Sequence, residues 1–253
     1  MLKVIDVLKY NGINTNNARD YRLILQSIIK NKKIQDLEYT LSQNEEREFI
    51  NLKSRIDNDE PIEYILNTAY FRNYTFYVDN NVLIPRKETE TIVPYLSSYK
   101  SVLDLGCGSG AVGITLKKEY NNINVTMSDI SPEAIKIARR NSKNIDIQII
   151  KSDLVSNINI SEFDCIFANL PYIDIDKKDE VVKSVYSYEP HIALFAKSKG
   201  LFLINKLIQE LNRKRFKGCL FLELDPWQIR YISKNKEIIK DQFGQNRFIK
   251  IEY

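Results

Sequence analysis

The spacing of hydrophobic residues changes from a helical to an alternating period near residue 70. Before that point, a helix is predicted over Ala18 to Asn31, and a second helix follows Ser42, which has capping-box spacing with Glu45. Pro61 then opens a short turn. The apolar residues aligned along the two helices are Tyr21, Leu25, Ile28, Ile29, Phe49, Leu52 and Ile56. We therefore predict a small helical domain over residues 1–70, suited to docking a partner.

Residues 71–84 have the pattern of a β-hairpin. Apolar and polar positions alternate from Phe71 to Val78, Asn80 and Asn81 form a turn signal, and Val82 begins a second apolar run. We predict that this hairpin links the helical domain to the rest of the chain. It delivers the segment that starts at Pro85 to the beginning of the next helix.

Predicted strands and helices alternate over residues 85–253. This order is typical of an α/β fold with a parallel sheet covered by helices on both faces. Helices are predicted from about Ala111, from Pro132 after the N-cap Ser131, from Gly200 and from Pro226. Residues 173–199 form a long segment without a clear pattern, which we expect to cover or recognise substrate. The strand candidates are Val102–Leu105, Val125–Met127, Ile147–Ile150, Asp164–Ala168, Cys219–Leu224, Ile238–Lys240 and Phe248–Glu252.

The composition argues against several classes of protein. Hydrophobic residues make up 43% and charged residues 28% of the 253 residues, which are the values of a globular protein. Residues 1–6 acquire charge too early for a signal peptide, and no apolar run approaches the roughly 20 residues of a membrane span, so we expect a cytoplasmic protein. One histidine, and three cysteines without CxxC spacing, argue against a metal site or disulfides.

The charge is distributed unevenly along the chain, whose net charge is +4. Residues 1–70 contain 10 lysine and arginine residues against 11 acidic residues, and residues 71–253 contain 27 against 22. The first segment is therefore not a basic arm that binds nucleic acid.

A nucleoside cofactor is indicated by residues at the ends of three predicted strands. The glycines of residues 104–110 permit a tight turn and close approach of a ligand to a helix N-terminus. Asp129 follows Gly110 by 19 residues, where an acid can accept both hydroxyls of a ribose. Asp153 and Leu154 end the third strand, where they would frame an adenine.

The glycine segment also matches the dinucleotide fingerprint GxGxxG from Gly108 to Gly113, which alone is weak evidence for NAD. The acid Asp104 before the glycines, and Asn169-Leu170-Pro171-Tyr172 after the fourth strand, have no evident use in hydride transfer. Together these features resemble the S-adenosylmethionine-dependent methyltransferases of the seven-stranded Rossmann-like class.

The segment Asn169-Leu170-Pro171-Tyr172 suits a planar group that carries an NH2. The Asn169 side-chain oxygen and the Leu170 carbonyl can each accept one N–H, and Pro171 and Tyr172 can form walls around the group. Similar motifs occur in methyltransferases that act on N6 of adenine, N2 of guanine or the side-chain amide of glutamine. We therefore assign these four residues to catalysis.

Further motifs resemble the HemK/PrmC family, which methylates N5 of a glutamine in peptide chain release factors. The match runs in order from about residue 60 to residue 253, while residues 1–60 resemble the family only as a helical domain. The motifs are Pro61–Ile65, the strand from Phe71 to Val78, Val82–Glu90, Asn169–Ile173, Tyr188–Pro190, Ala193–Phe195 and Asp241–Arg247.

The resemblance implies S-adenosylmethionine as cofactor and the Gly-Gly-Gln motif of a class I release factor as substrate. It also implies a monomer that forms no stable complex with nucleic acid or membrane. Pro85 and Arg86 are expected near the methionine end of the cofactor. The residues assigned to the cofactor site are Pro85, Arg86, Asp104, Gly106, Cys107, Gly108, Ser109, Gly110, Asp129, Ile130, Asp153, Leu154 and Asn169.

Two positions depart from the family pattern: Leu170 stands where proline is commoner, and Asp225 where glycine is often found. Pro171 still biases Leu170 toward extended backbone, so we expect activity to persist. Three alternatives stay open: a glutamine of a ribosomal protein, adenine N6 of ribosomal RNA, which the Leu170 form of the motif resembles more closely, and a non-catalytic assembly module. The acidic helical domain before the catalytic domain argues against RNA.

Overall fold

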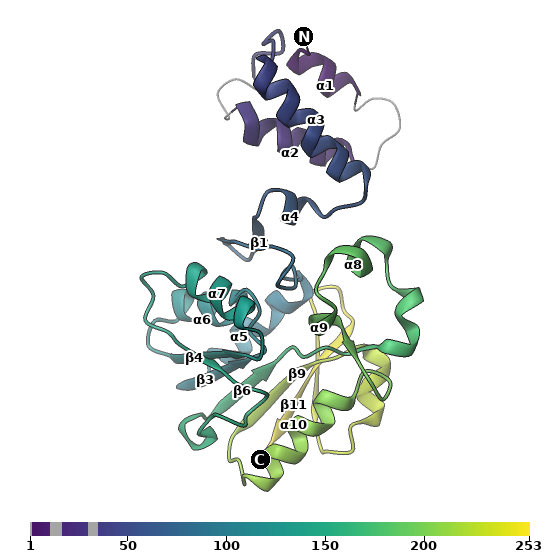
Figure 1. The fold of residues 1–253 in the computed structure, drawn as a ribbon. Coiled ribbons are helices and arrows are strands. Elements are labelled where there is room, and N and C mark those ends of the chain that lie inside the picture. The colour runs from purple at the N-terminus through teal and green to yellow at the C-terminus, as the bar shows by residue number, and fades with distance from the viewer. Residues whose placement is uncertain (1, 11–16, 30–34) are drawn as a thin grey trace. The chain divides into compact units, whose positions relative to one another are not determined.

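The computed structural model describes residues 2–10, 17–29 and 35–253, which fall into two compact units (Figure 1). The helical unit contains the chain up to Thr68 together with Lys183–Tyr188. The sheet unit contains Ala69–Val182 and Glu189–Tyr253. The predicted linker, residues 71–84, thus groups with the sheet unit, and one short helix from the predicted catalytic region groups with the helical unit.

The helical unit is built around a small apolar core. The predicted capping box is confirmed, because Glu45 N–H donates to Ser42 Oγ at 3.3 Å and Ser42 N–H donates to Glu45 Oε2 at 2.8 Å. The predicted end of the first helix at Asn31 lies outside the described residues. The core contains Val4, Val7, Tyr21, Ile24, Leu25, Ile29, Leu41, Phe49, Ile56 and Ile65. The helices are α1 (Val4–Tyr10), α2 (Ala18–Ile29), α3 (Gln43–Asp57), α4 (Ile62–Ile65) and α8 (Lys183–Tyr188).

Helix α8 is attached to the turn that follows α3. Lys183 Nζ lies 3.1 Å from Asp59 Oδ2, and the Tyr188 hydroxyl donates to the Asn58 carbonyl at 2.9 Å. The helical unit therefore includes a segment that comes far later in the sequence than its other helices.

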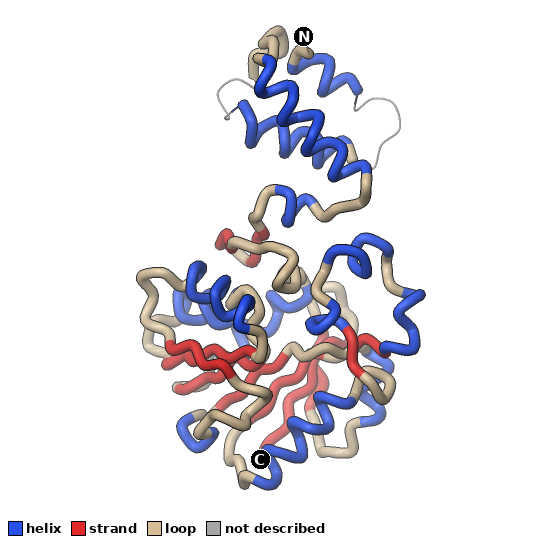
Figure 2. Tube along the Cα trace, viewed as in Figure 1, coloured by secondary structure: helices blue, strands red, loops and turns tan. Residues whose placement is uncertain are grey.

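All seven predicted strands are present, and they form one sheet (Figure 2). We had predicted a parallel sheet, but the sheet is mixed, because β11 runs antiparallel to both of its neighbours. The connection before it, Asp241–Gln245, is too short for the crossover that a parallel strand requires. In order across the sheet, the strands are β10 (Glu237–Lys240), β11 (Asn246–Glu252), β9 (Cys219–Glu223), β6 (Cys165–Ala168), β3 (Ser101–Leu105), β4 (Asn124–Asp129) and β5 (Gln148–Lys151).

Helices cover both faces of the sheet, as predicted. Along β3, Val102 packs in one apolar cluster with α5, α6 and α7, while Leu103 and Leu105 pack in the other with α10. Ser131 caps α7 as predicted, since Ala134 N–H donates to its hydroxyl. The helices are α5 (Ile92–Leu96), α6 (Ala111–Glu119), α7 (Pro132–Asn141) and α10 (Phe202–Arg213), with 3-10 turns η1 (Glu88–Thr91), η2 (Ile160–Glu162) and η4 (Pro226–Tyr231). The helix predicted from Pro226 is thus a 3-10 turn.

The hairpin prediction was wrong in its register. Strand β1 (Ala69–Phe71) pairs with β2 (Tyr74–Phe76), and the turn lies at Arg72, whose φ is +52°, and the residue after it. The turn predicted at residues 80–81 exists, and it is closed by the N–H of Val82, which donates to the Asp79 carbonyl at 3.1 Å, and by the Asp79 carboxylate, which accepts the N–H of Asn81. Residues 82–84 form no strand after this turn, so it does not connect a hairpin.

The long segment after β6 is closed at its base by a second small sheet. Strand β7 (Ile173–Asp174) pairs in parallel with β8 (Phe195–Ala196). Between them lie the 3-10 turn η3 (Ile175–Glu180), α8 and α9 (His191–Leu194). In the described part of the chain, every helix is too short or too polar to span a lipid bilayer.

Candidate active site

A cavity of about 250 Å³ opens in the sheet unit at the carboxyl ends of β3, β4 and β6. The topology brings these ends together because parallel strands present their carboxyl ends at one edge of a sheet. Two of the predicted site residues, Gly110 and Tyr172, do not line the cavity. The predicted residues that do line it are Pro85, Arg86, Asp104, Gly106, Cys107, Gly108, Ser109, Asp129, Ile130, Asp153, Leu154, Asn169, Leu170 and Pro171.

Asp129, at the end of β4, fixes the glycine loop, residues 104–110, at the end of β3. Its Oδ2 accepts the N–H of Gly108 at 2.9 Å, and its Oδ1 accepts the N–H of Ser131 at 2.9 Å. Burial raises the pKa of Asp129, and these two N–H donors oppose that rise. Each carboxylate oxygen still has a lone pair, so the side chain can accept a diol such as a ribose.

Asp104 holds the first turn of α6, the helix that follows the same loop. Its buried carboxylate accepts the N–H of Gly113 at 2.9 Å. Burial raises the pKa of Asp104 to about 7, and the nearby Asp129 adds to the effect. A Cβ atom at Gly113 would lie 2.8 Å from Met127 Cγ, so the last glycine of the GxGxxG match is explained by packing of α6 on β4.

Gly110 has a structural position. It is the N-cap of α6, and a Cβ atom there would lie 2.9 Å from Ile114 Cδ1. Its φ of +82° lies in the left-handed region that favours glycine, so the backbone conformation explains this glycine, and its contact with the cofactor stays a prediction.

The turn after β5 also forms part of the cavity wall, beside the glycine loop and the end of β4. Ser152 N–H donates to the Asp129 carbonyl at 3.0 Å, which joins this turn to β4. Leu154 is buried and has a φ of +47°, a conformation that costs a leucine free energy and is found mainly where surrounding structure imposes it. Asp153 forms an ion pair with Lys206 at 2.8 Å.

The acceptor motif, by which we mean the segment Asn169–Tyr172 predicted to bind the methyl-accepting group, lies beside the glycine loop. Leu170 is buried in the cluster that α10 covers, and a Cβ atom at Gly106 would lie 3.3 Å from Leu170 Cδ2. Gly106 itself has a φ of +73°. The leucine side chain therefore fills the core under the glycine loop, and Asn169 stays half-buried at the cavity.

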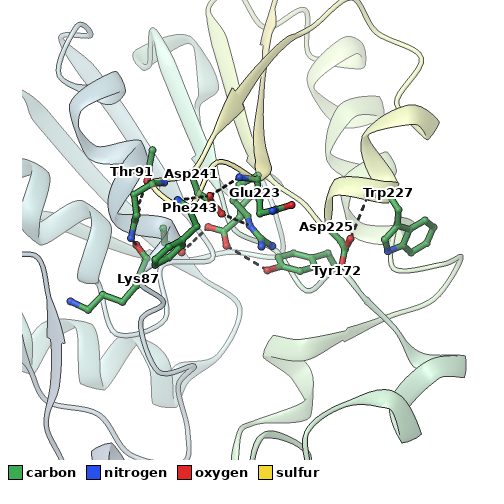
Figure 3. Close-up of polar contacts among 12 residues, drawn as sticks. Lys87, Thr91, Tyr172, Glu223, Asp225, Trp227, Asp241 and Phe243 are labelled. Carbon is green, nitrogen blue, oxygen red and sulfur yellow. Dashed lines mark hydrogen bonds and ion pairs between the residues drawn. The ribbon is translucent and has the colours of Figure 1, made fainter.

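Tyr172 is turned toward Glu223 at the end of β9 (Figure 3). Glu223 is buried and also accepts the Thr89 hydroxyl at 2.7 Å. Burial raises the pKa of Glu223 to about 7, against the hydrogen bond from Thr89 and the charge of Arg247. Burial, and then the Glu223 carboxylate, raise the pKa of the Tyr172 phenol, which is neutral at physiological pH.

Arg86 connects the cavity to the segment between β7 and β8. Its guanidinium lies 2.6 Å from Glu189 Oε1, and the Glu189 side chain is only 1% exposed. Ala193, a little further along, lines the cavity. The part of the predicted substrate-covering segment that belongs to the sheet unit, from Glu189 to Ala193, is therefore anchored beside the predicted site.

Sequence reasoning missed the contacts of Thr89 and Glu223 described above, and those of Gln228, whose side-chain amide donates to the carbonyls of Tyr172 and Lys199. One signal was present for Glu223, since it is a charged residue at the end of the apolar run that forms β9. Gln228 gave none, because its role depends on backbone carbonyls that folding brings to it.

The cavity fits an adenosyl cofactor. It offers a diol acceptor at Asp129, backbone N–H groups at a helix N-terminus and apolar walls at Ile130 and Leu154. The hMettl16 catalytic domain, in its complex with the MAT2A 3'UTR hairpin 6, shares the fold with a TM-score of 0.53 at 12% identity, over 80% of this chain and 91% of that domain. The family described as the methyltransferase small domain matches residues 87–188. Fold, cavity and match define an S-adenosylmethionine-dependent methyltransferase with a Rossmann-like fold.

Curated relatives narrow this class. The release factor glutamine methyltransferase of Streptococcus pneumoniae is 35% identical over 88% of this chain and 88% of its own length. The protein of the same name from Leptospira interrogans is 35% identical over 91% of this chain and 89% of its own length. The chain belongs to the release factor glutamine methyltransferase family.

Proposed function

We propose that this protein transfers a methyl group from S-adenosylmethionine to the side-chain amide nitrogen, N5, of a glutamine in a class I peptide chain release factor. The observation that carries the proposal is Asn169 at the edge of a cavity whose other walls suit an adenosyl group. The relatives' names supply the substrate class.

The reaction is difficult because the group that accepts the methyl, a glutamine amide nitrogen, reacts poorly. An amide nitrogen is a poor nucleophile because its lone pair is delocalised into the carbonyl. The Asn169 side-chain oxygen and the Leu170 carbonyl each accept one N–H of the glutamine, which orients the nitrogen. Oriented acceptors also stabilise positive charge that develops on the nitrogen. When bound, the cofactor would supply an electrophilic methyl group and leave as the neutral thioether, and the methylated nitrogen would lose one proton to water.

The cofactor would be held by the residues at the ends of β3, β4 and β5. Asp129 would accept the ribose hydroxyls, Asp153 and Leu154 would frame the adenine, and Pro85 and Arg86 would lie toward the methionine end. Asp104 holds the start of α6 through the N–H of Gly113.

In our proposal, the leucine at position 170 does not determine whether the substrate is a protein or an RNA. Its side chain is buried under the glycine loop, so leucine in place of proline is accommodated by the core. The backbone carbonyl that the mechanism uses is present with either residue.

The helical unit is the part that we assign to docking the release factor. We also propose that the enzyme works as a monomer in the cytoplasm and forms no stable complex with nucleic acid. A ribosomal-protein glutamine is the competing substrate.

The deciding experiment is methyl transfer from labelled S-adenosylmethionine to purified release factor, followed by mass spectrometry of the modified peptide. We expect one methyl group on the glutamine of the Gly-Gly-Gln motif and no label when that glutamine is alanine. Label that persists after the substitution, or that appears only on ribosomal protein or RNA, would overturn the proposal.

A further inference from the structure

The side-chain amide of Gln228 holds two stretches of backbone behind the acceptor motif. Gln228 is fully buried, and its Nε2 donates to the carbonyl of Tyr172 at 2.7 Å and to the carbonyl of Lys199 at 2.8 Å. The two N–H bonds of one NH2 group are thus both used. These two hydrogen bonds link Tyr172, the last residue of the acceptor motif, to Lys199, which precedes Gly200.

The backbone at Gly200 packs so closely against Tyr172 that no side chain fits between them. A Cβ atom at Gly200 would lie 1.8 Å from the Tyr172 carbonyl oxygen and 2.6 Å from Gln228 Nε2. Gly200 has a φ of +78°, in the left-handed region that favours glycine. The Tyr172 carbonyl therefore packs directly against Gly200, and Gln228 supplies its hydrogen-bond donor.

The orientation of the amide is fixed by Asp225. The N–H of Asp225 donates to Gln228 Oε1 at 3.1 Å, and the Asp225 carboxylate accepts the N–H of Trp227 at 3.4 Å (Figure 3). The bond from Asp225 N–H to Gln228 Oε1 is one half of a capping box for η4, in which the Asp225 side chain also accepts the N–H of Gln228. With its oxygen accepting from Asp225, the amide presents its NH2 group to the two carbonyls. The backbone N–H of Asp225 thus orients the side-chain amide that donates to the Tyr172 carbonyl.

We propose that Gln228 is a positioning residue for methyl transfer. It fixes the carbonyl of Tyr172 and so sets the path of the backbone that carries Asn169 and Leu170. This inference rests on the proposed function, in which those two residues hold the acceptor amide. Gln228 itself does not line the cavity. Because orientation supplies much of the catalysis, a small shift of this backbone slows transfer without altering the cofactor site.

The test is Gln228→Glu in the full chain, which turns the NH2 donor into an oxygen that faces two carbonyls. Gln228→Met, which removes the donor without adding a charge, serves as the second variant. Gln209→Glu makes the same chemical change at an exposed position of α10 and is the matched control. The measurements are kcat and KM with release factor, the Kd of S-adenosylmethionine by calorimetry, and the melting temperature.

We expect kcat to fall roughly 10- to 100-fold in both Gln228 variants, as for other displacements of reacting groups, with the cofactor Kd within about twofold of the wild type. The control variant keeps both values. If kcat is unchanged in the folded variants, or if kcat and cofactor affinity fall together with the folded fraction, Gln228 has no positioning role. An inactive wild-type enzyme would instead refute the proposed function, so the two failures are distinguishable.

Discussion

The phenol oxygen of Tyr172 lies 3.5 Å from Oε1 of Glu223, a residue that is only 1% exposed. The residue that ends the acceptor motif is thus held at its ring by a buried acid, and at its carbonyl by Gln228. A carboxyl group in this position is sensitive to pH, because ionisation would place a negative charge in the core.

Glu223 should make stability depend on pH. Its pKa is about 7 in the folded protein against an ordinary value of 4.5, so the folded chain keeps a proton that the unfolded chain releases. The free energy of unfolding therefore falls as pH rises from about 4.5 to about 7, by roughly 2–4 kcal/mol from this group. In Glu223→Gln this contribution disappears. Urea unfolding of both proteins from pH 5 to pH 8 checks it, and parallel pH profiles would contradict it.

Replacement of Asn169 by alanine should abolish most catalysis and spare the cofactor site. The variant loses the side-chain oxygen that we propose to accept an amide N–H, and loss of one such group typically costs about 100- to 1000-fold in kcat. Single-turnover labelling measures the rate, and calorimetry measures the Kd of S-adenosylmethionine. A rate close to that of the wild type would remove Asn169 from the mechanism.

Asp129→Asn should weaken cofactor binding. The change removes the negative charge and one acceptor oxygen where we place the ribose, and hydrogen bonds to charged groups contribute about 1.5–3 kcal/mol. The Kd of S-adenosylmethionine should rise about 10- to 100-fold. Asp146→Ala, at an exposed position before β5, is the comparison that should bind normally. Equal affinities in the two variants would count against the assigned ribose site.

Leu170→Ala should reduce stability more than activity. The leucine side chain is buried in the core beside Gly106, and loss of such a side chain typically costs 2–5 kcal/mol. The carbonyl of residue 170 survives the change, so kcat per folded molecule should stay within about threefold. Thermal unfolding and active-site titration separate the two effects, and a large loss of kcat in folded protein would show that the side chain also shapes the site.

Arg86→Ala should destabilise the sheet unit, because it leaves the buried Glu189 carboxylate without its guanidinium partner. Removal of one partner of a buried pair typically costs about 3–5 kcal/mol. The half-exposed Arg86 side chain places the expected loss at the lower end. Arg86→Ala combined with Glu189→Gln should recover part of it. If the double variant is no more stable than the single one, the ion pair does not anchor this segment.

The sequence was sufficient for features that depend on local pattern. Seven strands and the glycine loop follow from apolar runs and from glycine spacing, and Asp129 follows from its position at a strand end. The hairpin register could not be predicted, because Arg72 adopts a positive φ that its own chemistry does not favour. Gln228 could not be found either, since the carbonyls of Tyr172 and Lys199 become its partners only after folding.

The membership of α8 in the helical unit has a consequence for synthesis. Domains usually fold in order as the chain leaves the ribosome. Here the first unit along the chain obtains its last helix only once Tyr188 has been made, after Ala69–Val182, the first of the two segments of the sheet unit. The helical unit is therefore not a contiguous block that could be exchanged between relatives by cutting at Thr68, because such an exchange would leave Lys183 and Tyr188 facing a turn that did not evolve with them.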